Sequence, residues 1–573
     1  MNSPRVNFKF LKTFWWKKKF QVRVSDAMPS DKKEPPNKPD TEDIISSAIG
    51  EFGRWQLLHT FLLSLFNIPC TWHIFIPTFH AAERLVWCAR PEKFRNVAPH
   101  LWINCSGQSD AEYCSTTWRG DAAECPPFGE GGNFSGTAAC DRWEFAGEGS
   151  TIISDFELVC DRANLIRVGE MMFLAGVAVG GLVCGILSDK YGRKRTLMVS
   201  VLIQSVVGTI IAFSPWFSLY AIFRVILGFI SVSVVFSGFV LSIELVGGEW
   251  RTVAGISYLF PVSLSYMIIA GIGYLLRDWR HLQLAISLPG LLFQILWWVL
   301  PESPRWLLAL GRTKEVMRIL ESAARFNKRP LPPNLDKRLQ PETSEEPVEN
   351  VSVLDLFKTA EMRKRTFIQF LIWFSVYLVY YGLVLNLGNI GGNLYITSVL
   401  QGAVEIPAVA LSIFILLKGG RRLPLCLTMA VSGAACALIV PIYHVTGADL
   451  QWLVTCLAML SKFCISSSNA IMPVFTAELY PTTIRNIGVG AANVAAGIAL
   501  MAVPYLWMLA SFHQSVPMAV LAVFGILGGL SVLLLPETGH APLLDTLKEE
   551  EHGRRYSISP IDNSKRINNN CCS

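Results

Sequence analysis

Long apolar runs alternate with polar segments along most of the chain. A helix needs about 20 apolar residues to cross the roughly 30 Å of hydrocarbon in a bilayer. Twelve runs meet this length, and they lie at 56–79, 168–187, 196–213, 217–243, 253–275, 282–300, 366–387, 394–416, 424–443, 450–476, 487–510 and 516–535. The run at 217–243 is long for one helix. Splitting it would give an odd number of spans and put the two tails on opposite sides of the membrane, so we count it as one. The pattern predicts an all-α membrane protein with twelve transmembrane helices.

Polar segments divide these spans into two groups of six. The expected parts are an N-tail 1–55, a first half 56–300 with a loop at 80–167, a central segment 301–365, a second half 366–535 and a C-tail 536–573. The composition also indicates a membrane protein, because charged residues are 16% of the chain, against about 25% in soluble proteins. The net charge of +6 over 573 residues does not suggest a nucleic-acid partner.

Positive charge gathers in short loops that we expect on the cytoplasmic side. The loop after the second span carries Lys190, Arg193 and Lys194, and the loop after the eighth carries Arg421 and Arg422. The 80–167 loop is acidic on balance. We therefore expect both tails and the central segment in the cytoplasm and the large loop outside, as in a multi-pass protein of the plasma membrane.

The large loop holds six of the 14 cysteines, namely Cys88, Cys105, Cys114, Cys125, Cys140 and Cys160. An even set in an oxidising compartment predicts three disulfides, although the sequence does not choose among the pairings. Sequons at Asn104 and Asn133 predict glycosylation of the same loop. The alternative is unpaired cysteines and unused sequons. If copies of the chain associate, this loop is the expected contact surface.

The two halves repeat each other at equivalent helix ends. The matching segments are SDKYGRK (188–194) with LKGGRR (417–422), IELVGGEWR (243–251) with AELYPTTIR (477–485), and LPESPR (300–305) with LPETG (535–539). Three matches in the same order indicate a duplicated six-helix unit. Halves of this kind, related by a pseudo-twofold axis along the membrane normal, enclose a substrate site in one class of secondary transporters.

These residues make the chain resemble carriers of the major facilitator superfamily. Within it, the chain is similar to the organic cation, organic anion and carnitine transporter family. The resemblance covers about residues 50–540 and rests on STIISDFELVCDR (150–162), GILSDKYGRK (185–194), PESPRWLL (301–308), YYGLVLNLGNIGGNLY (380–395), VEIPA (404–408) and AELYPTTIRNIGVG (477–490). It implies the major facilitator fold and transport by alternating access.

The resemblance also implies a cytoplasmic gate built from the duplicated motifs. The expected gate residues are Asp189, Arg193, Lys194, Glu244 and Arg251 in the first half, and Arg421, Glu478 and Arg485 in the second. We expect Asp189 to face the positive N-terminal end of the eleventh span. Leu417 stands where the first copy has Asp189, so we predict an asymmetric gate that depends more on Asp189. The simpler interpretation is a positive-inside anchor.

Charged residues inside spans are costly and therefore mark candidate functional sites. Glu405 in the eighth span and Lys462 in the tenth are the main ones. They either form a buried structural pair or contact the substrate. Aromatic rings hold ammonium groups well, and an amide can donate to a carboxylate. The aromatic and amide candidates are Trp373, Tyr377, Tyr380, Tyr381, Phe239 and Asn386.

Substrate charge is the least determined property. One position of the eleventh span is acidic in cation carriers and Arg in anion and carnitine carriers of the resembled family, and here it is Gly497. With Glu405 and Lys462 both present, we expect a small organic cation or zwitterion, such as an amine, a carnitine-like compound or an amino-acid-like compound.

Several other functions stay open from sequence. The alternatives are an organic anion carrier or exchanger of the same family, a sugar carrier, and a non-transporting receptor or sensor on a carrier scaffold. An enzyme is not expected, because HExxH, Walker and GxSxG motifs in a suitable context are missing from the sequence. We expect no cofactor and no metal.

Overall fold

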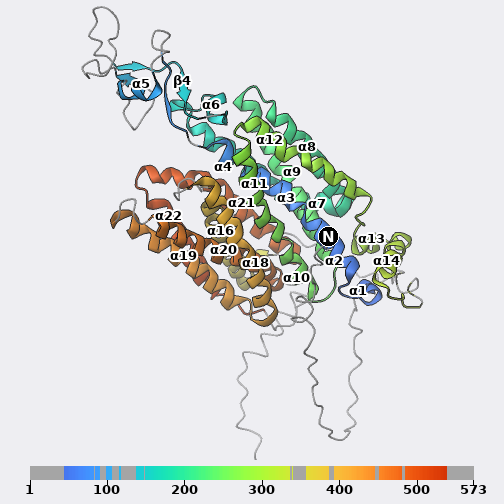
Figure 1. The fold of residues 1–573 in the computed structure, drawn as a ribbon. Coiled ribbons are helices and arrows are strands. Elements are labelled where there is room, and N and C mark those ends of the chain that lie inside the picture. Colours follow the sequence, from blue (N-terminus) through green and yellow to red (C-terminus); the bar gives the residue numbers. More distant parts are fainter. Residues whose placement is uncertain are drawn as a thin grey trace, which may run out of the picture. The chain divides into compact units, whose positions relative to one another are not determined.

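Long helices make up most of the described chain in the computed structural model (Figure 1). The first half contains the broken span α2 (Arg54–Ser64), α3 (Asn67–Phe75) and α4 (Pro77–His80), then α7 (Asn164–Tyr191), α8 (Arg193–Ala212), α9 (Phe217–Glu244), α10 (Trp250–Ser257) with α11 (Phe260–Leu275), and α12 (Trp279–Ser287) with the 3-10 helix η3 (Leu288–Trp297). The second half contains α16 (Ala360–Val384), α18 (Leu394–Lys418), α19 (Arg422–Val445), α20 (Gln451–Leu479), α21 (Arg485–Leu506) with the 3-10 helix η6 (Trp507–Ser511), and α22 (Val516–Val532).

The structure describes residues 44–82, 84–90, 98–105, 115–117, 137–147, 149–333, 335, 339, 356–385, 393–445, 451–480 and 484–538. Within them, ten helical segments are long and apolar enough to cross a membrane, and α22 is a shorter apolar helix. The α12–η3 segment occupies the remaining expected position. The prediction of an all-α protein with about twelve membrane helices is confirmed.

The sixth span differs from the uninterrupted helix that we expected at 282–300. Its α-helix ends at Ser287 and continues as ten residues of 3-10 helix. Pro289 lies at the start of that 3-10 segment. Proline lacks a backbone N–H and its ring clashes with the preceding turn, so it interrupts the α-helical hydrogen bonds at this point.

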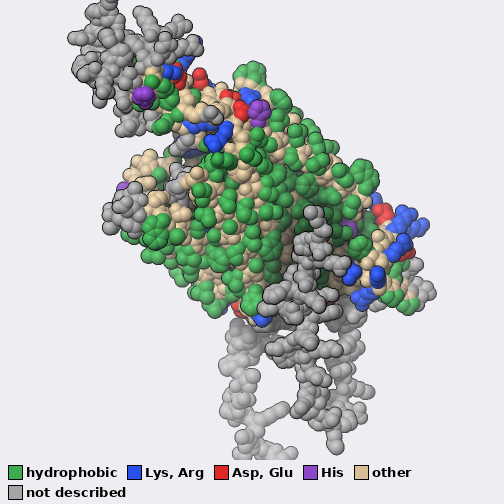
Figure 2. All heavy atoms as spheres, in the orientation of Figure 1, with side chains coloured by type: hydrophobic (Ala, Val, Ile, Leu, Met, Phe, Trp, Pro, Cys, Tyr) green, Lys and Arg blue, Asp and Glu red, His purple; other side chains and the backbone are tan. Residues whose placement is uncertain are grey.

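Apolar side chains cover the outside of the helices, as Figure 2 shows. Ile186, Leu275 and Trp298 are 68%, 77% and 81% exposed. Such a surface is unfavourable in water and matches the hydrocarbon of a bilayer, where helices satisfy their own backbone groups.

Small residues let α7 and α9 pack closely. A Cβ added at Gly176 would lie 2.1 Å from the carbonyl oxygen of Val225, and one at Gly228 would lie 2.0 Å from that of Phe173. Helix contacts in membranes depend on such close approach, because lipid tails remove the hydrophobic driving force between helices.

Short elements lie outside the spans. They are the helices α1 (Ile44–Ile49), α5 (Pro99–Cys105), α6 (Ile152–Asp155), α13 (Pro304–Ala309) and α14 (Thr313–Asn327), and the 3-10 helix η2 (Cys160–Arg162). The large loop also holds two antiparallel strand pairs, β1 (Val86–Cys88) with β4 (Trp143–Phe145) and β2 (Ser115–Thr117) with β3 (Thr137–Ala139).

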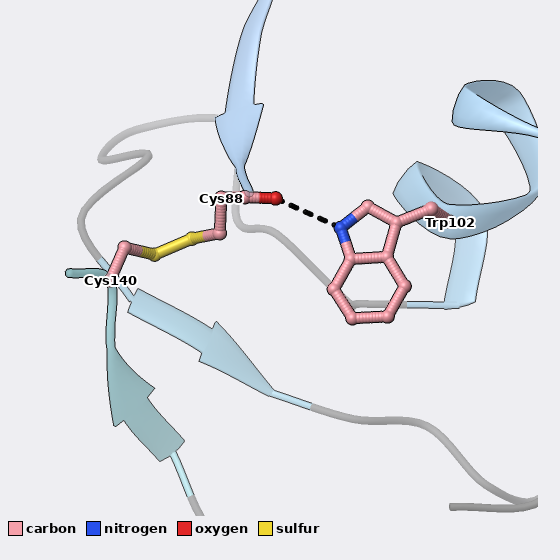
Figure 3. The surroundings of a disulfide bond; sticks show 3 residues. All are labelled: Cys88, Trp102 and Cys140. Carbon is pink, nitrogen blue, oxygen red and sulfur yellow. Dashed lines mark hydrogen bonds between the residues drawn. A yellow bond between two sulfur atoms is a disulfide. The ribbon is translucent and has the colours of Figure 1, made fainter. Parts of the chain in front are cut away.

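A disulfide joins Cys88 at the end of β1 to Cys140 just before β4 (Figure 3). The indole Nε1 of Trp102 donates to the carbonyl oxygen of Cys88 at 3.0 Å. Cys160 is also disulfide-bonded. These bonds agree with an oxidised loop.

The remaining loop predictions fall outside what the structure describes. Those positions are Cys114, Cys125, Asn133 and the side chains of Asn104 and Cys105. Glycosylation and the other disulfide pairings therefore stay predictions.

Asp278 joins the base of the large loop to the start of α12. Its carboxylate accepts hydrogen bonds from the backbone N–H groups of Arg280 and His281 and from the Ser150 hydroxyl. Burial raises the pKa of Asp278, but these hydrogen bonds outweigh it and leave the pKa below its usual value. A lowered pKa in the folded state means that the carboxylate stabilises the fold above its unfolded pKa and loses this effect as the pH falls through the folded one.

We predict that Asp278→Ala lowers the free energy of unfolding by about 1–2 kcal/mol, because an N-cap acceptor is lost. Thermal unfolding of the purified protein measures this. Asp141→Ala, at an exposed position of the large loop, is the control. Equal melting temperatures for the two variants would contradict the prediction.

Candidate functional site

A buried ion pair lies between two helices of the second half. The Nζ atom of Lys462 on α20 is 3.1 Å from Oε2 of Glu405 on α18, and the two side chains are 1% and 4% exposed. Removing two charges from water costs several kcal/mol per ion, so such a pair needs further partners.

Two tyrosines supply these partners. The Tyr380 hydroxyl on α16 donates to Oε1 of Glu405 at 2.8 Å. Lys462 Nζ lies 3.4 Å from the centre of the Tyr380 ring, within cation–π range. The Tyr380 hydroxyl also lies 3.1 Å from that of Tyr266 on α11. This last contact joins the second half to the first.

An aromatic column extends from this pair along α16. The rings of Trp373, Tyr377 and Tyr381 follow one another with centroids 5.9 and 5.7 Å apart. The spacing of four residues puts them on one face of a helix. Phe75 on α3 contacts both Tyr381, at 6.4 Å, and Tyr266, at 4.4 Å.

Four of the predicted aromatic residues thus lie together beside the ion pair. Phe239 on α9 lies elsewhere, with its ring 5.7 Å from Tyr258. Asn386 is outside the described residues. Tyr266 and Phe75 are additional members that we did not single out. The only sequence signal for Tyr266 is a tyrosine in mid-span, where the hydroxyl requires a partner.

Buried polar groups on α16, α18 and α20 surround the column. The Trp373 indole N–H donates to the Thr476 hydroxyl at 2.9 Å, which donates to Oε1 of Gln369 at 3.2 Å. Gln401 donates to the carbonyl oxygen of Leu383. Among the described atoms, Nε2 of Gln369 and Oε1 of Gln401 are buried without a partner. They can donate to and accept from a bound molecule.

The first gate motif forms a cluster around Arg193. Its guanidinium is 2.8 Å from the Asp189 carboxylate and 3.1 Å from that of Glu244. Asp189 has a 71% exposed side chain. Its carbonyl oxygen also accepts from the Trp306 indole at 2.7 Å. In this conformation Arg193 is the partner of Asp189, whereas we expected the end of the eleventh span.

Lys194 and Arg251, two further residues of the first motif, have contacts near this cluster. The backbone N–H of Lys194 donates to Glu302 at 2.9 Å, while its Nζ lies 5.6 Å from the centre of the Trp297 ring. Arg251 donates to the carbonyl oxygen of Val246 at 3.1 Å.

The second gate motif repeats this arrangement. Arg421 lies 3.3 Å from Glu478, and its backbone N–H donates to Glu537 at 2.6 Å. Arg485 begins α21. Glu537 in LPETG therefore takes the role that Glu302 has in LPESPR. The sequence repeat aligns these two glutamates. The structure shows in addition that each carboxylate accepts from the backbone of the basic loop in its own half, Glu302 at Lys194 and Glu537 at Arg421.

The named gate contacts each lie within one half, so in this conformation they brace a half and do not join the two. Two further contacts between the halves lie on the side of the large loop. The Tyr505 hydroxyl on α21 reaches Met171 on α7 at 3.2 Å, and the Tyr395 ring on α18 lies 5.9 Å from Phe79.

Gly497 on α21 lies directly against α7. A Cβ at this position would lie 2.8 Å from Cβ of Ala178. Real Cβ atoms essentially never come so close, so a side chain here would force the halves apart in this conformation. Glycine thus stands where the resembled carriers have a charged side chain, and it allows α21 to lie close to α7.

The fold and this intramembrane site define a membrane carrier of the major facilitator type. The family described as sugar (and other) transporter matches residues 160–546. An organic cation transporter protein of Drosophila melanogaster is 34% identical over 89% of this chain and 94% of its own length. Human solute carrier family 22 member 13 is 34% identical over 89% and 93%. Organic anion transporter 3 of Sus scrofa is 32% identical over 88% and 92%.

The chain belongs to the sugar (and other) transporter family, and its relatives are organic cation and anion transporters of solute carrier family 22. It is a multi-pass membrane transporter of small organic ions and not an enzyme. The proton:xylose symporter XylE shares the fold, with a TM-score of 0.57 and 17% identity over 87% of this chain and 98% of its own.

We predict that Asp189→Asn lowers substrate uptake at least about fivefold, the effect of roughly 1 kcal/mol of lost coupling. Leu417→Asp is expected to change uptake less, because the second motif works without an acidic group there. Uptake by cells with equal surface expression of both variants measures the difference. Equal effects would contradict an asymmetric gate.

Proposed function

We propose that this carrier moves a small organic cation or zwitterion, with the substrate ammonium group bound at Glu405. The observation that carries this proposal is the position of Lys462. Its ammonium group rests on the Tyr380 ring beside the Glu405 carboxylate. A cation is therefore already held in a site made of one carboxylate and one ring face, the two groups that recognise organic ammonium ions.

Substrate binding is then an exchange of one cation for another. The incoming ammonium group takes the place of Lys462 between Glu405 and Tyr380. A zwitterion has the further advantage that its carboxylate can pair with the displaced Lys462, so that neither charge is left unpaired in the membrane. The unpartnered amide atoms of Gln369 and Gln401 supply further polar contacts.

The second candidate is an organic anion, with Lys462 as its partner. This candidate is supported by the similarity to the relative from Sus scrofa, which is named an organic anion transporter. A purely anionic substrate would leave the Glu405 carboxylate close to a like charge, which is unfavourable in a low-dielectric site.

The proposal also covers the membrane location and the topology of the carrier. We infer a plasma-membrane location with both tails and the central segment in the cytoplasm, supported by the basic loops after the second and eighth spans. The two halves, 56–300 and 366–535, are proposed as the units that move against each other. Association of copies through the large loop stays a prediction.

We predict that Glu405→Gln abolishes saturable uptake of a labelled organic cation, with a loss of more than about tenfold. The single change also leaves Lys462 buried without a counter-charge, which costs about 3–5 kcal/mol of stability. The double variant Glu405→Gln/Lys462→Met removes both charges, so it is expected to regain stability but not uptake.

Uptake and thermal unfolding of both variants separate these effects. The probes are a labelled quaternary amine, carnitine and a dicarboxylate, and Glu321→Gln at an exposed site on α14 is the charge control. Normal cation uptake by the double variant would make the pair structural. Anion uptake insensitive to Glu405 would favour the second candidate. No uptake of any probe by protein at the cell surface would contradict the proposed substrate class.

The contact between the Tyr266 and Tyr380 hydroxyls links the binding site to the opposite half. Tyr266→Phe removes this bond, worth about 1 kcal/mol, and keeps the ring. We predict a roughly fivefold lower maximal rate of uptake. Tyr274→Phe on the same helix, where the ring is exposed, is the control. Equal rates for the two variants would show that the Tyr266 hydroxyl has no part in transport.

A further inference from the structure

A cavity lies at the loop side of the first half, away from the proposed transport site. Its volume is about 630 Å³, within the range of about 300–1,000 Å³ that is usual for ligand sites. It lies between the loop-side ends of α7 and α9, beneath the segment that enters α7. It shares no lining residue with the Glu405 site.

The rim of this cavity carries two charged groups of opposite sign. Glu157 and Arg162 both line it and both are exposed. Neither forms an ion pair with another described residue. Asp155 also lines the cavity, but its carboxylate is occupied by the Trp279 indole and the Arg280 guanidinium. One available carboxylate and one available guanidinium therefore border the same space.

The backbone of this rim is held in an unusual conformation. Glu157 has a φ of +50° and Cys160 a φ of +54°, in the left-handed region that side-chain-bearing residues rarely adopt. The Leu158 N–H donates to the carbonyl oxygen of Ile153, and Cys160 is disulfide-bonded. Strained residues fixed by their surroundings in this way are concentrated at ligand sites.

Three aromatic contacts fix the inner wall. The Phe156 ring lies 6.1 Å from that of Phe217, 6.0 Å from that of Tyr220 and 5.7 Å from that of Trp279. Phe156 and Phe217 both line the cavity. The wall is thus formed before any ligand binds, which lowers the entropic cost of binding.

The floor is apolar and continues into the surface that faces lipid. It includes Leu165, Met172 and Val225. Ile222 and Trp216, which also line the cavity, are 58% and 69% exposed. Tryptophan at the end of a membrane helix lies at the level of lipid headgroups. An occupant with a chain can therefore enter from the bilayer.

From this combination we infer that the cavity binds a zwitterionic phospholipid from the leaflet on the loop side. The choline ammonium group binds at Glu157, the phosphate binds at Arg162, and the Trp216 ring lines the same cavity. One acyl chain follows Leu165 and Ile222. A soluble zwitterion would match the rim but would leave the apolar floor uncovered, so the floor favours the lipid.

The test uses the purified full-length chain in detergent. It is incubated with equimolar phosphatidylcholine and phosphatidylglycerol of the same acyl chains, and native mass spectrometry counts the retained lipids. We expect at least about fivefold preference for phosphatidylcholine. Glu157→Gln and Arg162→Gln should each reduce its retention about fivefold or more, the effect of one lost contact of roughly 1 kcal/mol.

The matched controls are Glu321→Gln and Arg318→Gln, two exposed positions on α14, which should retain the lipid like the wild type. Equal retention of the two lipids by the wild type would overturn the inference, as would wild-type retention by both rim variants. Displacement of phosphatidylcholine by an equal concentration of free phosphocholine would also overturn it and identify a site for soluble solutes. Melting temperatures confirm that the rim variants are folded, which their exposure predicts.

Discussion

The cost of holding a charge inside a membrane is the constraint on which this structure depends. Lys462 and Glu405 lie almost completely buried, and each requires the other. Tyr380 completes the arrangement by donating to the carboxylate and placing its ring against the ammonium group. Because Tyr380 also contacts Tyr266 in the other half, the ion pair lies next to a contact between the halves.

This arrangement suggests how binding and movement are connected. In the proposed exchange, a substrate enters only by compensating the charge of Lys462 that it displaces, so selection by charge and disruption of the pair are the same event. The aromatic column of Trp373, Tyr377 and Tyr381 continues from the pair, and under the same proposal it provides a surface for the rest of the substrate. The halves also contact each other on the loop side, through Tyr505 with Met171 and through Phe79 with Tyr395.

Duplication of the six-helix unit explains why both halves have the same polar contacts at the helix ends far from the large loop. Glu302 and Glu537 each accept from the backbone of the short loop in their own half, and Arg193 and Arg421 each pair with a glutamate at the end of a long helix. Each half is therefore stiffened as a unit, as movement of one half against the other requires. The lipid site proposed at the rim of Glu157 would add a contact with the bilayer to one half only.

The sequence by itself determined the membrane class, about twelve helices, the duplicated halves and the family, because length, hydrophobicity and repeated motifs are local properties of the chain. It also identified Glu405 and Lys462, since charge within an apolar run is visible without a structure. The tertiary structure decided that these two residues pair and that Tyr266 joins them. It also decided that Phe239 lies elsewhere and that Gly497 meets α7. These facts depend on which helix faces which, and helix rotation and packing in a membrane follow from contacts between segments distant in the chain.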